Sequence, residues 1–230
     1  MNDGREPQAK AYQGLRALSQ LQKLIESIHG VEVGAQVPDF LIDAAARQRL
    51  APLSSSDEAL LVLQNGDELR VALFLDDLVL QRLSKRGAWT HERLAAFCAA
   101  AEGVSHFVYL AHRARAGRPV SQLELEAQAE LDKYLCVLLQ LWAAGRRSAS
   151  AELRTRLFQR VQLRNGLTEA ERDRYRLANA LAAACARALE AKYVFTGRLE
   201  GLLREVRKLY RLSGGEKFSA LAAGQMAWAA

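Results

Sequence analysis

The sequence predicts a mainly helical α+β fold, and two observations indicate it. Apolar residues recur every three or four positions along most of the 230 residues, which is the spacing of amphipathic helices. Between residues 31 and 75 the pattern changes to short apolar or alternating runs, which are typical of strands. We therefore expect a small α+β part at 1–75 and a bundle of five or six helices at 76–230. The sequence leaves open whether the two parts form one cooperative unit.

The strongest local signal in the first part is a β-hairpin centred on Asn65-Gly66. Asn-Gly favours positive φ at the two central positions of a tight turn, and apolar runs lie on both sides of it. The expected strands are Ala59–Gln64 and Glu68–Leu75. Because a two-stranded hairpin is marginally stable alone, we expect Phe40–Ile42 to add a third strand.

Helix ends are marked by capping residues. Ser121 with Glu124 and Thr168 with Glu171 have the spacing of capping boxes, and Gly30 suits the end of a helix. The expected helices span residues 11–29, 76–85, 90–116, 121–144, 149–164, 168–195, 198–211 and 216–223.

Three smaller expectations concern single positions. Gly103, in the middle of helix 90–116, is expected to bend that helix. His29 and His91 lie near element ends and are expected to be surface or capping groups. Ser213-Gly214-Gly215 is expected to form a turn before the last helix.

A strip of polar residues is the one candidate for a chemical site. The loop at 117–120 is short, so helices 90–116 and 121–144 are expected to form an antiparallel hairpin. Counting outward from that loop brings His106 level with Glu130. The strip comprises Glu102, His106, Tyr109, Arg113, Glu126, Glu130 and Lys133.

Three interpretations of this strip remain open. It could be a buried network of ion pairs and hydrogen bonds that fixes the helical hairpin. It could hold a metal ion through one imidazole and three carboxylates, although the cations of the strip already neutralise carboxylates. It could be a pocket in which His106 acts as acid or base and Glu130 orients it. The metal set would be Glu102, His106, Glu126 and Glu130.

Charge is unevenly spread along the chain. The net charge is +6, but residues 1–145 carry 15 Lys and Arg against 18 Asp and Glu, whereas residues 146–230 carry 17 against 8. Most of these cations are arginines, whose planar guanidinium groups suit contact surfaces better than lysine does. We expect an acidic partner surface to be bound by Arg154, Arg160, Arg164, Arg204, Arg207, Lys208 and Arg211.

Tyrosines among these cations leave a second class of partner open. Tyr175, Tyr193 and Tyr210 interleave with the basic residues, and basic helices with aromatic side chains can bind phosphates and stack on bases. The sequence carries no recognition-helix or RNA-binding motif, so nucleic acid is the alternative and a protein is the first expectation.

Recognisable enzyme motifs are absent. The chain has no phosphate-binding glycine loop, no nucleotide-binding GxGxxG after a strand and no nucleophile elbow. The three cysteines have no CxxC spacing and the N-terminus lacks a signal-peptide layout, so we expect cytoplasmic residence. The sequence contains no run of about 18 consecutive apolar residues, so we expect no membrane-spanning helix.

Taken together, these features predict a helical binding protein of the cytoplasm, an adaptor or regulator that uses its arginine-rich C-terminal helices. The alternatives are a nucleic-acid-binding protein and a metal-dependent or acid/base enzyme at the His/Glu strip. No cofactor is expected beyond that metal ion, and homo-oligomerisation is left open.

Overall fold

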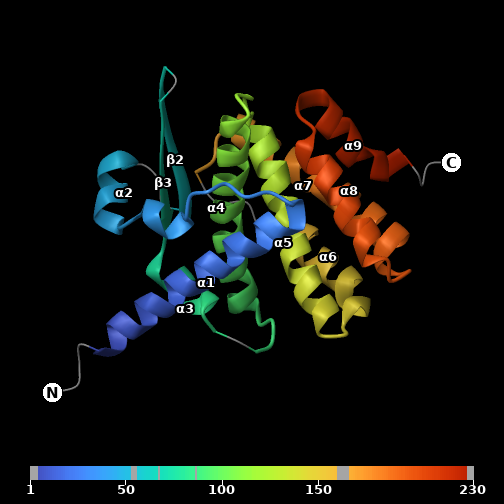
Figure 1. The fold of residues 1–230 in the computed structure, drawn as a ribbon, viewed down its shortest axis with the longest axis horizontal. Helices are drawn as coiled ribbons and strands as arrows, with labels where there is room; N and C mark the ends of the chain where they lie inside the picture. The colour runs from blue at the N-terminus through green and yellow to red at the C-terminus, as the bar shows by residue number, and fades with distance from the viewer. Residues whose placement is uncertain (1–4, 53–55, 67, 86, 160–165, 227–230) are drawn as a thin grey trace. The chain divides into compact units, whose positions relative to one another are not determined.

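The computed structural model describes residues 5–52, 56–66, 68–85, 87–159 and 166–226, and its elements are labelled in Figure 1. The chain divides into two compact units, which are described separately. The first comprises Met1–Leu24 and Glu32–Val108, and the second comprises Ile25–Val31 and Tyr109–Ala230. Two helices pass from one unit to the other: α1 (Arg5–His29) and α4 (His91–Arg115). The expected boundary after residue 75 stays a prediction.

A three-stranded sheet is the centre of the first unit. Its order is β1-β3-β2, with β1 (Leu41–Ile42) parallel to β3 (Glu68–Leu75) and β2 (Glu58–Asn65) antiparallel to it. The tip of the β2–β3 ribbon projects beyond the other elements of this unit (Figure 1). The register pairs Asn65 with Glu68 around the Asn-Gly turn, so the predicted hairpin is confirmed. The expected third strand is also present, shortened to two residues.

The sequence missed one helix in this unit. The stretch before the hairpin was expected to hold only strand-like runs, but it contains a 3-10 turn, η1 (Val37–Phe40), and the helix α2 (Ala44–Leu50). Asp43 caps α2, because its Oδ1 accepts a hydrogen bond of 2.7 Å from the backbone N–H of Ala46. The short helix expected at 76–85 is α3 (Asp77–Leu83), and Asp76 caps it.

Gly103 lies where α4 packs closely on the sheet, and the expected bend of the helix at this position stays a prediction. A Cβ atom at this position would lie 2.7 Å from Cδ1 of Leu73 in β3 and 3.0 Å from Oε1 of Glu58 in β2. Within the first unit, the missing side chain therefore lets the sheet approach α4 closely.

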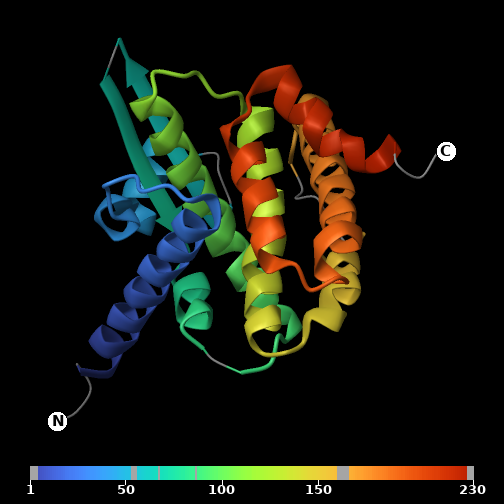
Figure 2. The same cartoon turned by 45° about the vertical axis from the view of Figure 1, so that its right-hand side comes forward.

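The second unit is helical. Its elements are α5 (Gln122–Ala143), η2 (Arg147–Ala149), α6 (Ser150–Phe158), α7 (Glu169–Leu189), the π-helical turn η3 (Glu190–Val194), α8 (Leu199–Arg211) and α9 (Gly214–Met226). Helix α7 packs against α5, α6 and α9, and Figure 2 shows α7 in orange beside α9 in red. The fully buried core residues of α5 include Ala127, Tyr134, Leu135 and Leu138.

Both predicted capping boxes are confirmed. The Ser121 and Thr168 side chains accept hydrogen bonds from the backbone N–H groups of Glu124 and Glu171, whose carboxylates bond back to the cap residues. The last helix differs from expectation. It begins at Gly214, inside the stretch expected to be a turn, and it is longer than the predicted 216–223.

Helix α4 passes a length-and-composition test for a membrane span. Its most apolar 18-residue window has a mean hydropathy of 1.4, and 67% of that window is buried within the structure. A mostly buried window is typical of a core helix, which passes the same test.

Candidate functional site

The predicted polar strip is divided between the two units. Glu102 and His106 belong to the first, and the other five residues belong to the second. The pairing of His106 with Glu130 therefore stays a prediction. In the second unit, Nζ of Lys133 donates to Oε1 of Glu130 at 2.7 Å, so these two strip residues form an ion pair along α5.

The remaining strip residues have other surroundings. Arg113 is buried and donates to the carbonyl oxygen of Pro119 at 3.3 Å, Glu126 is half-buried on α5, and Tyr109 belongs to a buried network described below. Among the residues that the structure describes, no group of three or more His, Cys, Asp or Glu is placed to hold a metal ion.

The predicted cationic surface is concentrated on α8. Two shallow depressions flank the outward face of this helix, with volumes of about 530 Å³ and about 830 Å³. Glu200, Arg204 and Lys208 line both of them. Their charged lining residues are Lys192, Arg198, Arg204, Arg207, Lys208 and Arg211, together with the two acids Glu200 and Glu205. We call these eight residues the α8 basic face.

Two arginines of the α8 basic face cap the end of α1. Arg207 donates from Nε to the carbonyl oxygen of Ile28 at 3.1 Å and from Nη2 to that of Ser27 at 3.0 Å. Arg211 donates to the carbonyl oxygens of His29 and Gly30, both at 3.3 Å. The last carbonyl groups of a helix have no partner within the helix, and cationic donors there also suit the helix dipole. These two arginines therefore have an intramolecular role, which sequence reasoning did not foresee.

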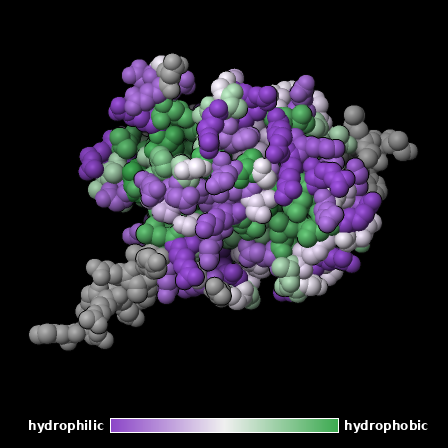
Figure 3. Space-filling model, in the orientation of Figure 1, coloured by the Kyte–Doolittle hydropathy of each residue, from purple (hydrophilic) through white to green (hydrophobic). Residues whose placement is uncertain are grey.

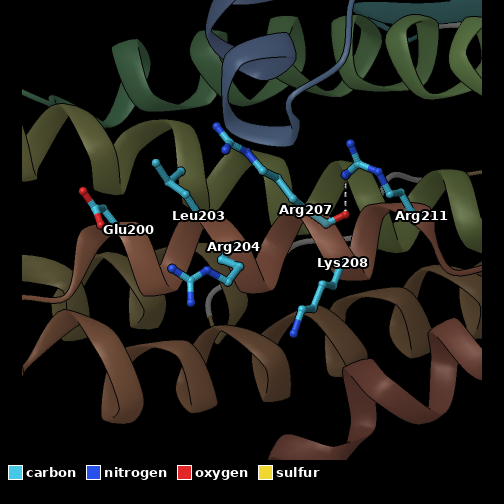
Figure 4. A pocket seen from close by; sticks show the side chains of 6 residues that line it. All are labelled: Glu200, Leu203, Arg204, Arg207, Lys208 and Arg211. Carbon is cyan, nitrogen blue, oxygen red and sulfur yellow. Dashed lines mark hydrogen bonds between the residues drawn. The ribbon is translucent and has the colours of Figure 1, made fainter.

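The other two cations of α8 point elsewhere. In Figure 4, Arg204 and Lys208 lie on one side of α8, whereas Arg207 and Arg211 lie on the side of the α1 end. Both Arg204 and Lys208 are exposed. These two side chains are therefore the part of the face best placed to meet a partner.

Arg154, another residue of the predicted partner surface, forms an intramolecular ion pair. Its Nε donates to Oε2 of Glu190 at 2.7 Å, and the hydroxyl of Tyr134 donates to the other oxygen of that carboxylate at 3.2 Å. Glu190 is 2% exposed and begins the π-helical turn η3. A buried carboxylate needs such partners, so Arg154 stabilises the end of α7. Arg160 and Arg164 lie outside the described residues.

Beneath α8 lies a buried polar network that the sequence did not predict. Nε2 of His29 and Oδ1 of Asp132 are 2.6 Å apart, and both side chains are fully buried. The amide of Gln128 donates to the same carboxylate oxygen at 2.8 Å. His29 was expected at the surface because it ends α1, so that expectation is wrong: its ring lies in the core of the second unit.

Lys217 of α9 extends the network. Its Nζ donates to Oε1 of Gln128 at 2.7 Å and to the hydroxyl of Tyr109 at 3.0 Å, and it lies 4.2 Å from the centre of the Tyr109 ring. Burial lowers the pKa of Lys217 to about 7, although the carboxylates of Asp132 and Glu124 act in the opposite direction.

Aromatic rings close the network on the α8 side. The ring of Tyr210 stacks on His29 at 3.9 Å with an interplanar angle of 14°, and it meets Tyr109 edge-on at 5.0 Å. Burial raises the pKa of Tyr210 well above its ordinary value. On one side of α8, cationic side chains are exposed to solvent. On the other side, the ring of Tyr210 covers the buried imidazole of His29.

The buried network connects several helices of the second unit. It joins the last turn of α1 to α5, α8 and α9, and every named member is at most 2% exposed. Its effect is to fix α8, and therefore the α8 basic face, on the rest of the second unit.

Comparisons with known proteins give no further guide. The chain matches no protein-family model, and it has no match among the curated proteins or the solved structures.

Proposed function

We propose that this protein is a cytoplasmic adaptor or regulator that binds an acidic surface of another protein through the α8 basic face. The observation that carries the proposal is the lining of the two depressions on α8, which contains six cationic side chains and only two acidic ones. Guanidinium groups bind carboxylates through paired hydrogen bonds, and such charge complementarity speeds and orients association.

The form of α8 supports this proposal. Its opposite side is anchored by Leu202, Val206 and Tyr210, which are at most 1% exposed. Arg207 and Arg211 fasten the helix to the end of α1. A contact surface held in one arrangement loses little conformational entropy on binding.

Burial of Tyr193 and Tyr210, two of the three tyrosines among the basic residues, favours a protein partner over a nucleic acid. Tyr210 is 0% exposed and Tyr193 is 8% exposed, and Tyr193 donates its hydroxyl hydrogen bond to Glu205 at 3.1 Å. Neither ring is therefore available to stack on a base, which is the contact that sequence-tolerant nucleic-acid binding uses.

The proposal is tested with an acidic peptide as the probe. A fluorescein-labelled peptide rich in Glu and Asp is titrated with the full chain, and the anisotropy gives the dissociation constant. Arg204→Glu combined with Lys208→Glu is expected to weaken binding about tenfold or more, because the attraction at the exposed side of α8 becomes repulsion. This variant leaves the arginine contacts to α1 in place.

A matched control makes the same change of charge elsewhere. Arg172 and Arg187 are exposed on α7, outside the α8 basic face, and replacing both with Glu is expected to leave peptide binding within about twofold of the unaltered chain. A DNA duplex of equal charge is titrated in parallel. Equal losses in the two variants would overturn the proposal, and so would tighter binding of the duplex than of the peptide.

A further inference from the structure

The free edge of strand β2 is a second surface of interest, in the first unit. The sheet order β1-β3-β2 places β2 at an edge, and within the described part of the chain no strand pairs with its other side. An edge strand presents a row of backbone N–H and C=O groups to which another strand can add.

This edge lacks the features that usually protect such strands. Natural edges carry charges, prolines or bulges, or they are very short. β2 is eight residues long, and its segment 59–64 contains neither a charged residue nor a proline. Two of its apolar side chains are well exposed, with Val62 46% exposed and Leu63 61% exposed. Figure 3 shows green apolar surface on the ribbon below its hydrophilic tip.

The opposite edge of the same ribbon provides an internal contrast. β1 pairs only with Leu73 and Phe74 of β3, so the outer half of β3 extends beyond it. That half carries Glu68 and Arg70, which form an exposed ion pair of 2.9 Å. Charged residues therefore protect the β3 side of the ribbon, whereas the β2 side is unprotected.

We propose that two copies of this chain pair through the free edges of their β2 strands to form a symmetric dimer. The strands run antiparallel, and the two three-stranded sheets become one six-stranded sheet, β1-β3-β2-β2-β3-β1. A twofold axis perpendicular to the sheet passes beside Leu61 or Val62, because symmetry requires paired residues to share a face.

The charge pattern of β2 fits a second copy of itself. Glu58 is the only charged residue of the strand. With the axis at Leu61 it faces Gln64 of the other copy, and with the axis at Val62 it faces Gly66, so two carboxylates never meet. With the axis at Leu61 the apolar residues between them face apolar residues, whereas with the axis at Val62 Leu60 faces Gln64. Because the twofold uses identical edges, the pairing closes as a dimer and does not propagate.

The first experiment is sedimentation velocity of the full chain over a wide range of concentrations. The unaltered chain is expected to show a monomer–dimer equilibrium. Val62→Lys combined with Leu63→Lys should weaken dimerisation about tenfold or more, because two copies would bring like charges together at the edge. Leu78→Lys, at a 55% exposed position of α3, is the matched control and should dimerise normally. A chain that stays monomeric, or a double variant that dimerises as the control does, would refute the pairing.

A second experiment locates the contact. Leu61→Cys and Val62→Cys are prepared separately and oxidised mildly. Facing Cβ atoms are closest, at about 4.5 Å, in pairs that share no backbone hydrogen bond, and this lies at the upper end of the range for a disulfide bond. Cysteine at the position beside the axis should therefore cross-link the two copies. Leu78→Cys should not. Equal cross-linking of the three variants, or cross-linking of Leu78→Cys alone, would place the dimer contact elsewhere and overturn the proposal.

Discussion

Replacing Asp132 with alanine should lower the free energy of unfolding by about 3–5 kcal/mol, the range expected when one member of a buried ionic network is removed. The carboxylate accepts hydrogen bonds from His29 and Gln128 in a fully buried site. Without it, both donors lose their acceptor, and the nearby Lys217 loses an attractive charge. Urea unfolding followed by circular dichroism measures the change.

Two further variants make this result specific. Asp132→Asn keeps an oxygen that accepts a hydrogen bond but removes the charge, so its cost should lie between those of the alanine variant and the unaltered chain. Asp173→Ala removes an exposed carboxylate that is paired with Arg176, and it should change stability by less than about 0.5 kcal/mol. A cost for Asp132→Ala as small as that of Asp173→Ala would show that the network does not hold the second unit together.

The stability contributed by Lys217 should rise with pH across the neutral and alkaline range. In the folded protein the pKa of Lys217 is about 7, against an ordinary value of 10.5, because burial disfavours the charged form. Between these two pH values the unfolded chain binds a proton that the folded chain does not, so raising the pH favours folding. The contribution is fully present above about pH 10.5 and is lost as the pH falls through about 7.

The measurement compares the unaltered chain with Lys217→Met. The free energy of unfolding of the unaltered chain, minus that of the variant, should increase by about 3 kcal/mol between pH 6.5 and pH 9.5, since one pKa unit corresponds to about 1.4 kcal/mol. The groups that face Lys217 are Tyr109 and Arg113 from α4, Glu124 and Asp132 from α5, Cys185 from α7 and Tyr210 from α8. Lys23→Met removes an exposed lysine and is the control for charge. A difference that is flat or falls with pH would contradict the burial of a neutral amine.

Much of the fold could be predicted because its signals are local. The Asn65-Gly66 turn sets the register of the hairpin through backbone preference alone. Each capping box, at Ser121 and at Thr168, marks the start of a helix with a signal that spans only four residues. Helix α2 was missed because the strand-like surroundings outweighed its short pattern, although Asp43 is an ordinary capping residue. The close packing at Gly103 could not be predicted because its neighbours, Leu73 and Glu58, are distant in sequence.

The buried network could not be predicted for the same reason. His29 and Asp132 are 103 residues apart, and Lys217 and Gln128 are 89 residues apart, so no spacing rule connects them. A weaker signal was present: Lys217 follows Gly214 and Gly215 at the start of a helix and occupies a position that the apolar pattern assigns to the buried side.

Charge counting indicated a concentration of cations that includes α8, but not the contacts that each side chain makes. An excess of arginine in the C-terminal half indicated a contact surface, and α8 does carry a concentrated basic face. Counting alone could not distinguish Arg207 and Arg211, which cap α1, from Arg204 and Lys208, which project to the other side. That distinction depends on the position of the α1 end, which only the three-dimensional arrangement supplies.

The most direct test of the central claim is to locate the acidic peptide on the protein. A titration of isotope-labelled full chain with the Glu- and Asp-rich peptide is followed by amide chemical shifts. The account predicts that the largest shifts occur at residues 192–211, around the α8 basic face, and that they vanish in the Arg204→Glu, Lys208→Glu variant. Shifts centred on the three arginines near the start of α7, at residues 172–176, or no shifts at all, would contradict it.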